Sequence, residues 1–354
     1  MPFFSIRIET SRVLDEKYFM NINDPLYGSF EITEPVLLDV LSAAAVQRLR
    51  TVLQHGITGL IGITNPTTRF DHSAGAMLLI RKVCATSGPA DVLLKEQVAA
   101  LLHDVSHTAF SHVIDYVFGD HDGQGYHEQQ KEAYIARSDL PHVLGLHGYN
   151  WRDFLHEQDF PLLEQPSPAL CADRLDYFLR DARDLCLAAD AEVHAAIASL
   201  AVHAGRLVTT DLEVARWMAY TFIAADEASW ANFREVGLYE LAARAIRLGL
   251  ETGVLTEADL WRGDAAAWAK LQSSPDPRLQ AALRLVSPAT GFEWDAANPT
   301  FAVSTKLRTI DPPVLLNGSA HPLSTLDPAF AHYRLDYLRR KAGKWPMRVV
   351  EGKT

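Results

Sequence analysis

Residues 101–112 read LLHDVSHTAFSH, and the rest of the chain is best interpreted outward from this stretch. An apolar run, VAALL at 98–102, precedes the adjacent pair His103 and Asp104. Imidazole and carboxylate together suit hard-to-borderline cations such as Fe, Mn, Zn, Co or Mg. Six of the 14 histidines fall between His72 and His127. The stretch therefore predicts a divalent metal site at the end of an apolar helix.

Apolar residues on both sides of this stretch recur mostly at helical spacing. We expect a short strand near 29–33 and, after Pro288, strands and loops followed by a final helix. The pattern predicts a mainly α fold with a smaller α+β C-terminal region. The expected helices cover about 36–53, 74–83, 92–103, a stretch ending at 118, one starting at 126, 169–187, 212–226, two between 229 and 249, further helical segments to 286, and 328–341.

Composition limits the class of protein. The 354 residues include 44 acidic and 33 basic side chains, for a formal charge of −11, and 48% are apolar. Such a chain can bury a core, and its acidic excess argues against binding extended nucleic acid. No run of about 20 apolar residues predicts a membrane span, and MPFFSIRIETSRVLDEKYF lacks a signal-peptide core. With three widely spaced cysteines as well, we expect a cytoplasmic protein.

Further metal ligands are expected in polar positions next to apolar helices. His72 precedes one such helix, and Asp173 opens another, ADRLDYFLRD at 172–181. Two histidines and two aspartates leave coordination positions open for water and substrate. The predicted metal ligands are thus His72, His103, Asp104 and Asp173.

The same regions offer acid–base groups and phosphate-binding groups. His112 lies three residues before Asp115, so that the carboxylate can orient the ring on one helix. His107 and the pair His127-Glu128 are nearby in sequence. Guanidinium groups bind phosphate oxygens bidentately, which makes the following arginines candidate clamps: Arg69, Arg174 and Arg180.

Each feature also has a plainer interpretation when it is taken alone. A single His-Asp dipeptide is weak support for metal binding. The arginines can belong to a solvated salt-bridge face, and Tyr177 in an apolar helix is typical of core packing. The joint pattern is what favours a metal-dependent enzyme.

The combination of motifs resembles the HD-domain phosphohydrolase superfamily, and most of all its deoxynucleoside triphosphate triphosphohydrolase branch. The resemblance rests on NDPLYG at 23–28, QRLRTVLQHG at 47–56, TRFDHSAG at 68–75, LLHDVSHTAFSH at 101–112, YHEQ at 126–129 and ADRLDYFLRD at 172–181. It implies an HD-domain core over 1–235, with a C-terminal region over 236–354 packed on it.

The resemblance also implies roles for individual residues. The metal ligands it implies are His72, His103, Asp104 and Asp173. It implies acid–base and leaving-group chemistry for His107, His112, Asp115 and His127. It implies substrate contacts for Gln54, Arg69, Arg174, Tyr177 and Asp181. Arg174 stands where that branch commonly has lysine.

We therefore expect a metal-dependent phosphohydrolase acting on nucleotides through a metal-activated water. Other interpretations stay open: a nucleoside mono-, di- or triphosphate phosphatase of a nucleoside biosynthetic pathway, a cyclic-nucleotide or alarmone hydrolase, and a non-catalytic nucleotide sensor. A homodimer is a further possibility. The strands after 290 have two open roles, covering the mouth of the site or forming a dimer contact.

Overall fold

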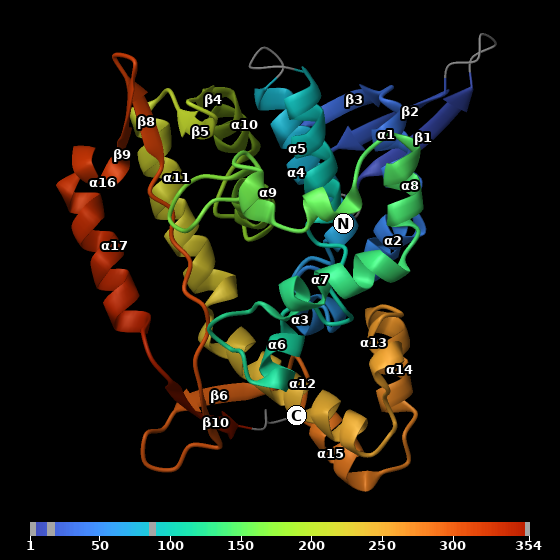
Figure 1. Ribbon diagram of the computed structural model, residues 1–354. Helices are drawn as coiled ribbons and strands as arrows, with labels where there is room; N and C mark the ends of the chain where they lie inside the picture. The colour runs from blue at the N-terminus through green and yellow to red at the C-terminus, as the bar shows by residue number, and fades with distance from the viewer. Residues whose placement is uncertain (1–4, 13–17, 85–89, 351–354) are drawn as a thin grey trace.

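The computed structural model describes residues 5–12, 18–84 and 90–350 of the chain (Figure 1). Its helices are α1 Pro35–Ser42, α2 Ala44–Gln47, η1 Arg48–Thr51, α3 Ile57–Leu60, α4 Arg69–Val83, α5 Ala90–Leu102, α6 Val113–Phe118, α7 Tyr126–Arg137, α8 Leu140–Leu146, η2 Trp151–Phe154, η3 Glu157–Asp159, α9 Ala172–Asp184, α10 Asp190–Ser199, α11 Leu212–Ala225, η4 Asp226–Trp230, α12 Phe233–Glu251, α13 Glu257–Leu260, α14 Asp264–Gln272, α15 Pro277–Leu285, α16 Leu323–Leu326 and α17 Pro328–Lys341.

Three small sheets accompany the helices. The strands are β1 Arg7–Arg12, β2 Tyr18–Asp24, β3 Gly28–Ile32, β4 Leu200–His203, β5 Arg206–Thr209, β6 Gly291–Trp294, β7 Phe301–Val303, β8 Pro313–Leu316, β9 Ser319–Pro322 and β10 Trp345–Val350. They pair in the orders β1-β2-β3, β6-β10-β7 and β4-β5-β8-β9. The mainly α fold with small sheets in the C-terminal region is thereby confirmed.

Helix α4 lies at the centre of the first apolar core. Its residues from Arg69 to Ile80 are all buried, and it packs between α5 and α9 (Figure 1). A capping box starts the helix: Thr68 accepts from the Asp71 amide, and the Asp71 carboxylate accepts from the Thr68 amide. This cap satisfies two otherwise unpaired amides. It explains why α4 begins at Arg69 rather than at 74, which places His72 inside the helix.

The helix expected over 36–53 is wrong as a single element, because it is divided into α1, α2 and η1. Ala43 is extended, with ψ of 137°, and α2 starts directly after it. The amides of Ala44 and Ala45 donate to the distant carboxylate of Asp139, at 2.5 and 3.2 Å. A tertiary contact therefore caps a second helix where local spacing predicts a continuous one.

Two other expectations also need correction. The two helices predicted between 229 and 249 are one helix, α12, preceded by the π-helical turn η4. The hairpin β4–β5 was not predicted, because its four-residue strands are too short for a clear alternation. The expected boundary at 235/236 falls inside α12, and the division into two units stays a prediction.

A second apolar core joins α6, α12, α14 and α15 to the β6-β10-β7 sheet, and a third joins α11 to α17. Strand β8 pairs with β5 in parallel, so the C-terminal region returns to the first part of the chain. Among the described residues, none of the helices has both the length and the apolar character that crossing a bilayer requires.

Close packing of α4 on α9 depends on a glycine. A Cβ atom at Gly75 would lie 2.0 Å from Nη2 of Arg180 and 2.2 Å from Oδ1 of Asp176. We expect Gly75→Ala to lower the free energy of unfolding by about 1–3 kcal/mol, since the buried pair has to move. Denaturant unfolding measures this loss.

Gly145→Ala in α8 is the matched control, because a Cβ there meets nothing within 4 Å. Helix propensity predicts that this change leaves stability equal or raises it by up to about 1 kcal/mol. Equal unfolding free energies for Gly75→Ala and the wild type would contradict the packing argument.

Candidate active site

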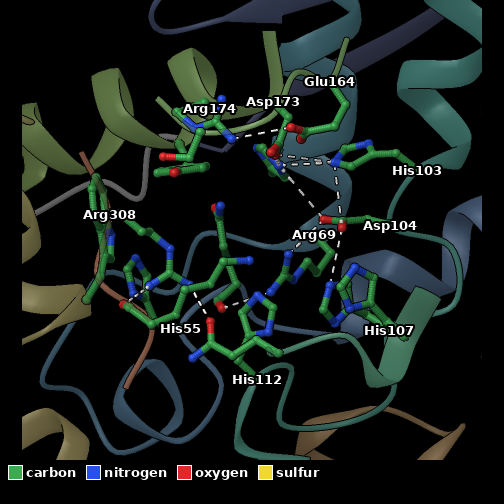
Figure 2. Close-up of a pocket in the computed structure, with 18 of the residues that line it drawn as sticks. His55, Arg69, His103, Asp104, His107, His112, Glu164, Asp173, Arg174 and Arg308 are labelled. Carbon is green, nitrogen blue, oxygen red and sulfur yellow. Dashed lines mark hydrogen bonds and ion pairs between the residues drawn. The ribbon is translucent and has the colours of Figure 1, made fainter. Parts of the chain in front are cut away.

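The four predicted metal ligands lie together at the ends of three helices. Figure 2 labels three of them, His103, Asp104 and Asp173. His72 comes from α4, His103 and Asp104 follow α5 directly, and Asp173 lies in the first turn of α9. The Nε2 atoms of His72 and His103 are 3.2 Å apart. Oδ1 of Asp173 is 2.9 Å from the first of these nitrogens and 3.6 Å from the second. Asp104 approaches them to 3.9 and 3.6 Å.

Hydrogen bonds on the far side of each ring decide which nitrogen faces this cluster. Nδ1 of His103 is 2.7 Å from the carbonyl oxygen of Ala100, which only accepts, so that nitrogen carries the hydrogen. Nδ1 of His72 is likewise 2.8 Å from the carboxylate of Asp176. In the neutral rings both Nε2 lone pairs therefore face each other and the two carboxylates. This arrangement calls for a positive charge between them.

The four residues fit a divalent cation. Ligands bonded at about 2.1 Å in octahedral geometry are about 3.0 Å apart, close to the shortest separations in the cluster. Burial lowers the pKa of His72, but hydrogen bonds to Asp173 and Asp176 outweigh it and raise that pKa to about 10. The surroundings thus favour a positive charge at this ring, as they would favour a metal ion. One ligand atom from each of His72, His103 and Asp104 lies within 4.8 Å of the other two, close enough for all three to hold one metal ion.

Asp176 holds the His72 ring through a buried network that the sequence interpretation had not assigned. Its carboxylate accepts from Nε and Nη2 of Arg180 at 2.9 and 3.0 Å, and from the Tyr27 hydroxyl at 2.9 Å. Arg180 in turn contacts Asp24 at 2.6 Å. Burial raises the pKa of Asp176, but the guanidinium of Arg180 lowers it overall. Arg180, a candidate phosphate clamp by sequence, therefore supports Asp176 behind the predicted metal ligand His72 instead.

Three histidines form a cluster next to Asp104. The rings of His107 and His127 stack with centroids 3.9 Å apart, and His112 meets His107 edge-on at 5.1 Å. Nε2 of His107 is 3.3 Å from Oδ1 of Asp104. Burial lowers the pKa of all three histidines well below the usual value, which keeps them neutral near pH 7. The positive charge of Arg69 lowers the pKa of His107 and His112 further.

Asp115 lies behind His112, as the i, i+3 spacing predicts. Its Oδ2 is 2.9 Å from Nδ1 of His112, and its Oδ1 accepts from the Tyr126 amide at 2.9 Å. Burial raises the pKa of Asp115 to about 6. One buried ring nitrogen of the cluster, Nδ1 of His127, has no hydrogen-bond partner among the described residues, whereas Nε2 of His107 has only the contact to Asp104.

The five predicted substrate-binding residues all line the same cavity, which has a volume of about 370 Å³. Arg69 contacts Asp104 at 2.9 Å and Ser111 at 3.1 Å. Asp181 accepts from the Trp230 indole at 2.6 Å and lies 3.0 Å from Nε2 of His55. Gln54 and Tyr177 also line the cavity, and the buried Oε1 of Gln54 has no hydrogen-bond partner within the described part of the chain.

Arg174 makes its hydrogen bonds to other residues of the protein. Its guanidinium donates to the carbonyl oxygens of Ala169 at 2.7 Å and Gln165 at 3.2 Å, and it contacts Glu164 at 3.3 Å. The guanidinium fork thus joins α9 to the preceding loop, a geometry that a lysine cannot reproduce.

Sequence reasoning missed several residues that line the cavity. They come from the segment before α3, the polar loop 119–125, the segment before α9, η4, α12 and the irregular segment after β7, which are far apart in sequence. Periodicity shows which face of an element is buried and does not mark these residues as neighbours in one cavity. The missed residues include His55, Gln124, Glu164, Trp230, Glu235, Tyr239, Lys306 and Arg308.

Loss of the carboxylate behind His72 should weaken metal binding. We expect Asp176→Asn to lower the affinity for a divalent cation about 10–100-fold, because the neutral amide polarises and orients the ring less. Chelator competition measures this affinity. Asp336→Asn, at an exposed carboxylate of α17, is the control. Unchanged affinity in Asp176→Asn would exclude a supporting role for this residue.

Glu235 makes stability depend on pH. Burial raises the pKa of this carboxyl group to about 7, although His55 and Ser229 oppose the shift. The unfolded chain loses the proton near its ordinary pKa, whereas the folded chain holds it until about pH 7. The carboxyl group therefore favours the folded state below its ordinary pKa, and this stabilisation is lost as pH rises to about 7.

Glu235→Gln should remove this dependence. We expect similar unfolding free energies for the two proteins at pH 4.5, and a wild type less stable than the variant by on the order of 3 kcal/mol at pH 8. Urea unfolding across this range measures the difference. A constant difference at all pH values would mean that Glu235 does not titrate in the folded state.

Comparisons with known proteins agree with this geometry. The model of the HD domain matches residues 69–181, which contain all four predicted metal ligands. The metal-dependent phosphohydrolase cns2 of Cordyceps militaris is 37% identical over 340 residues, which cover 94% of this chain and 95% of that protein. The deoxynucleoside triphosphate triphosphohydrolase SAMHD1 of Gallus gallus is 33% identical over 101 residues, 26% of this chain and 16% of that protein.

A solved structure shows the same fold. A phosphohydrolase from Bacteroides thetaiotaomicron superimposes with a TM-score of 0.65 at 18% identity, covering 94% of this chain and 100% of that one. Because the likeness to cns2 extends over nearly the whole of both chains, the chain belongs to the HD-domain family of metal-dependent phosphohydrolases.

Proposed function

We propose that this protein hydrolyses a phosphate ester of a nucleoside or deoxynucleoside phosphate. The proposal rests mainly on one observation. A single cavity is lined by the predicted metal ligands, by three neutral histidines and by polar and aromatic side chains that suit a sugar and a base. Next to the cluster lie the unpartnered Oε1 of Gln54, the carboxylate of Asp181 and the aromatic rings of Tyr177 and Trp230. Hydroxyl groups and a flat base are the chemistry that such a lining recognises. The short similarity to SAMHD1 supports the same class.

The proposed metal ligands are His72, His103, Asp104 and Asp173. A divalent cation bound to them supplies positive charge to the phosphate oxygens and makes water acidic enough to attack near neutral pH. Fe, Mn, Co, Zn and Mg all suit this donor set. Arg69, held by Asp104 and Ser111, adds a second positive charge beside the same carboxylate.

His112 is the proposed donor of a proton to the leaving oxygen. In the free protein burial and Arg69 keep its ring neutral. A phosphate dianion bound beside the ring raises its pKa, and the carboxylate of Asp115 stabilises the imidazolium at Nδ1. His107 and His127 stack next to it, and the free Nδ1 of His127 can bind a phosphate oxygen or a water molecule. The mechanism thus uses all four residues implied by the family resemblance.

Removal of a ligand tests the mechanism. We expect His103→Ala and Asp104→Ala each to lower kcat by about 10³-fold or more, because both the cation and its charge are lost. The effect is measured as release of phosphate or polyphosphate from a panel of nucleotides, with each metal added in turn. Mass spectrometry of the products then identifies the substrate. Full activity in either variant would contradict the mechanism.

His194→Ala is the control, since this exposed histidine of α10 lies outside the cavity. The same panel separates the alternatives. Thermal stabilisation by nucleotides without any product under any metal would favour a sensor. Turnover of cyclic nucleotides or alarmones, without turnover of ordinary nucleotides, would mean that the enzyme hydrolyses a different phosphate bond. A homodimer stays a prediction, which the molar mass in solution tests.

A further inference from the structure

An irregular segment of the C-terminal region enters the cavity. Residues 304–312 connect β7 to β8 without regular secondary structure, and Lys306 to Arg308 line the cavity. In Figure 1 this segment is the orange trace rising from the β6–β10 sheet to β8. Both cationic residues of the segment, Lys306 and Arg308, therefore border the same cavity.

Contacts on two sides fix this segment. Toward the polar loop 119–125, Oγ of Ser304 donates to Asp122 at 3.0 Å and Nη2 of Arg308 donates to Gln124. Toward η4, the amide of Arg308 donates to Oδ2 of Asp226 at 2.9 Å. The two cationic side chains therefore start from a backbone that is held in place, as a binding site requires.

Lys306 and Arg308 form fewer ion pairs than the arginines on the helices. Among the described residues, no carboxylate lies within ion-pair distance of Lys306 or Arg308, whereas Arg69 and Arg174 each form an ion pair. Lys306 is exposed and has one long contact, 3.5 Å to the carbonyl oxygen of Gly123. Arg308 donates to the carbonyl oxygen of Lys306 at 3.2 Å and to Gln124, which are both uncharged acceptors. The charges of Lys306 and Arg308 are thus not neutralised, and part of their N–H groups is left for an anion.

The two positive charges also repel each other. Partial loss of solvation, and then the charge of Arg308, lowers the pKa of Lys306, even though Glu128, Asp173 and Glu164 oppose the shift. An anion bound between two like charges relieves that repulsion. Figure 2 shows Arg308 on the opposite side of the cavity from His103 and Asp104.

We propose that Lys306 and Arg308 form an anion subsite for a phosphate group other than the one held at the metal ligands. This inference rests on the proposed function and narrows it: the favoured substrates are nucleotides that carry more than one phosphate. The subsite uses residues of the C-terminal region, outside the stretch 69–181 that the HD domain covers.

Binding of inorganic phosphates tests the subsite without turnover. The probes are magnesium-saturated tripolyphosphate and orthophosphate, titrated calorimetrically into the metal-loaded protein at constant ionic strength. We expect tripolyphosphate to bind more tightly than orthophosphate to the wild type. Lys306→Gln/Arg308→Gln should weaken tripolyphosphate binding roughly tenfold or more and leave orthophosphate binding unchanged. Retained preference for tripolyphosphate in this double variant would overturn the proposal.

Lys344→Gln/Arg339→Gln is the matched control, because it removes the same two charge types from exposed positions of the C-terminal region. Arg308→Gln also loses the contact to Gln124, so the unfolding temperature of each variant is measured as well. If the double variant is unstable, the single variant Lys306→Gln provides the test. The one long contact of the Lys306 side chain contributes little to folding, so this variant should stay folded. An unchanged affinity for tripolyphosphate in Lys306→Gln would then overturn the proposal.

Kinetics separates the two proposals. If nucleotides are substrates, the double variant should raise KM for a nucleoside triphosphate by the same factor and leave KM for the monophosphate unchanged. Loss of tripolyphosphate binding without turnover of any nucleotide would support the subsite and contradict the proposed function. Full turnover with identical KM values in wild type and double variant would support the proposed function and overturn the subsite.

Discussion

The cluster of the Nε2 atoms of His72 and His103, 3.2 Å apart, with the carboxylates of Asp104 and Asp173 is the constraint on which the rest of the structure depends. Such a buried group of acceptors is unfavourable without a positive charge among them. The protein maintains it by fixing the opposite edge of each ring, through Ala100 behind one and Asp176 behind the other. The fold around α4 can therefore be understood as a support for this one cluster.

That support explains features of sequence that lie far from the cluster. Asp24 ends β2 and Tyr27 lies in the turn between β2 and β3, yet they contact Arg180 and Asp176 on α9. Gly75 lets these side chains approach the backbone of α4. Removing charge or adding volume here is expected to act on the predicted metal ligands through His72. The N-terminal sheet thus serves the site, although no residue of it lines the cavity.

Positive charges in the cavity divide into two kinds. Arg69 and Arg174 have protein partners and set the charge and shape of the walls. Lys306 and Arg308 enter on the segment after β7 and keep donors for an anion. If the proposed subsite binds substrate, that binding depends on packing between the helical core and the C-terminal region. The acidic total charge of −11 does not oppose this, because the local arrangement of charges controls the potential in a cavity.

The chain by itself determined the helical class, most helix positions and the residue types of the cluster. Apolar spacing and the polar residues at helix ends are local signals, so His103, Asp104, Asp173 and the pair His112–Asp115 could all be predicted. The break of the helix after Ser42 could not be predicted, because its cap is the carboxylate of Asp139 from a distant helix. Arg180 was likewise misjudged, since its partners are not neighbours in sequence.

Only the tertiary structure decided which side chains meet in the cavity. Glu235 and Trp230, and above all Lys306 and Arg308, reach it from segments whose local pattern carries no trace of it. The physical reason is that a binding site is assembled by contacts between residues far apart in sequence. Periodicity reports only which face of an element is buried.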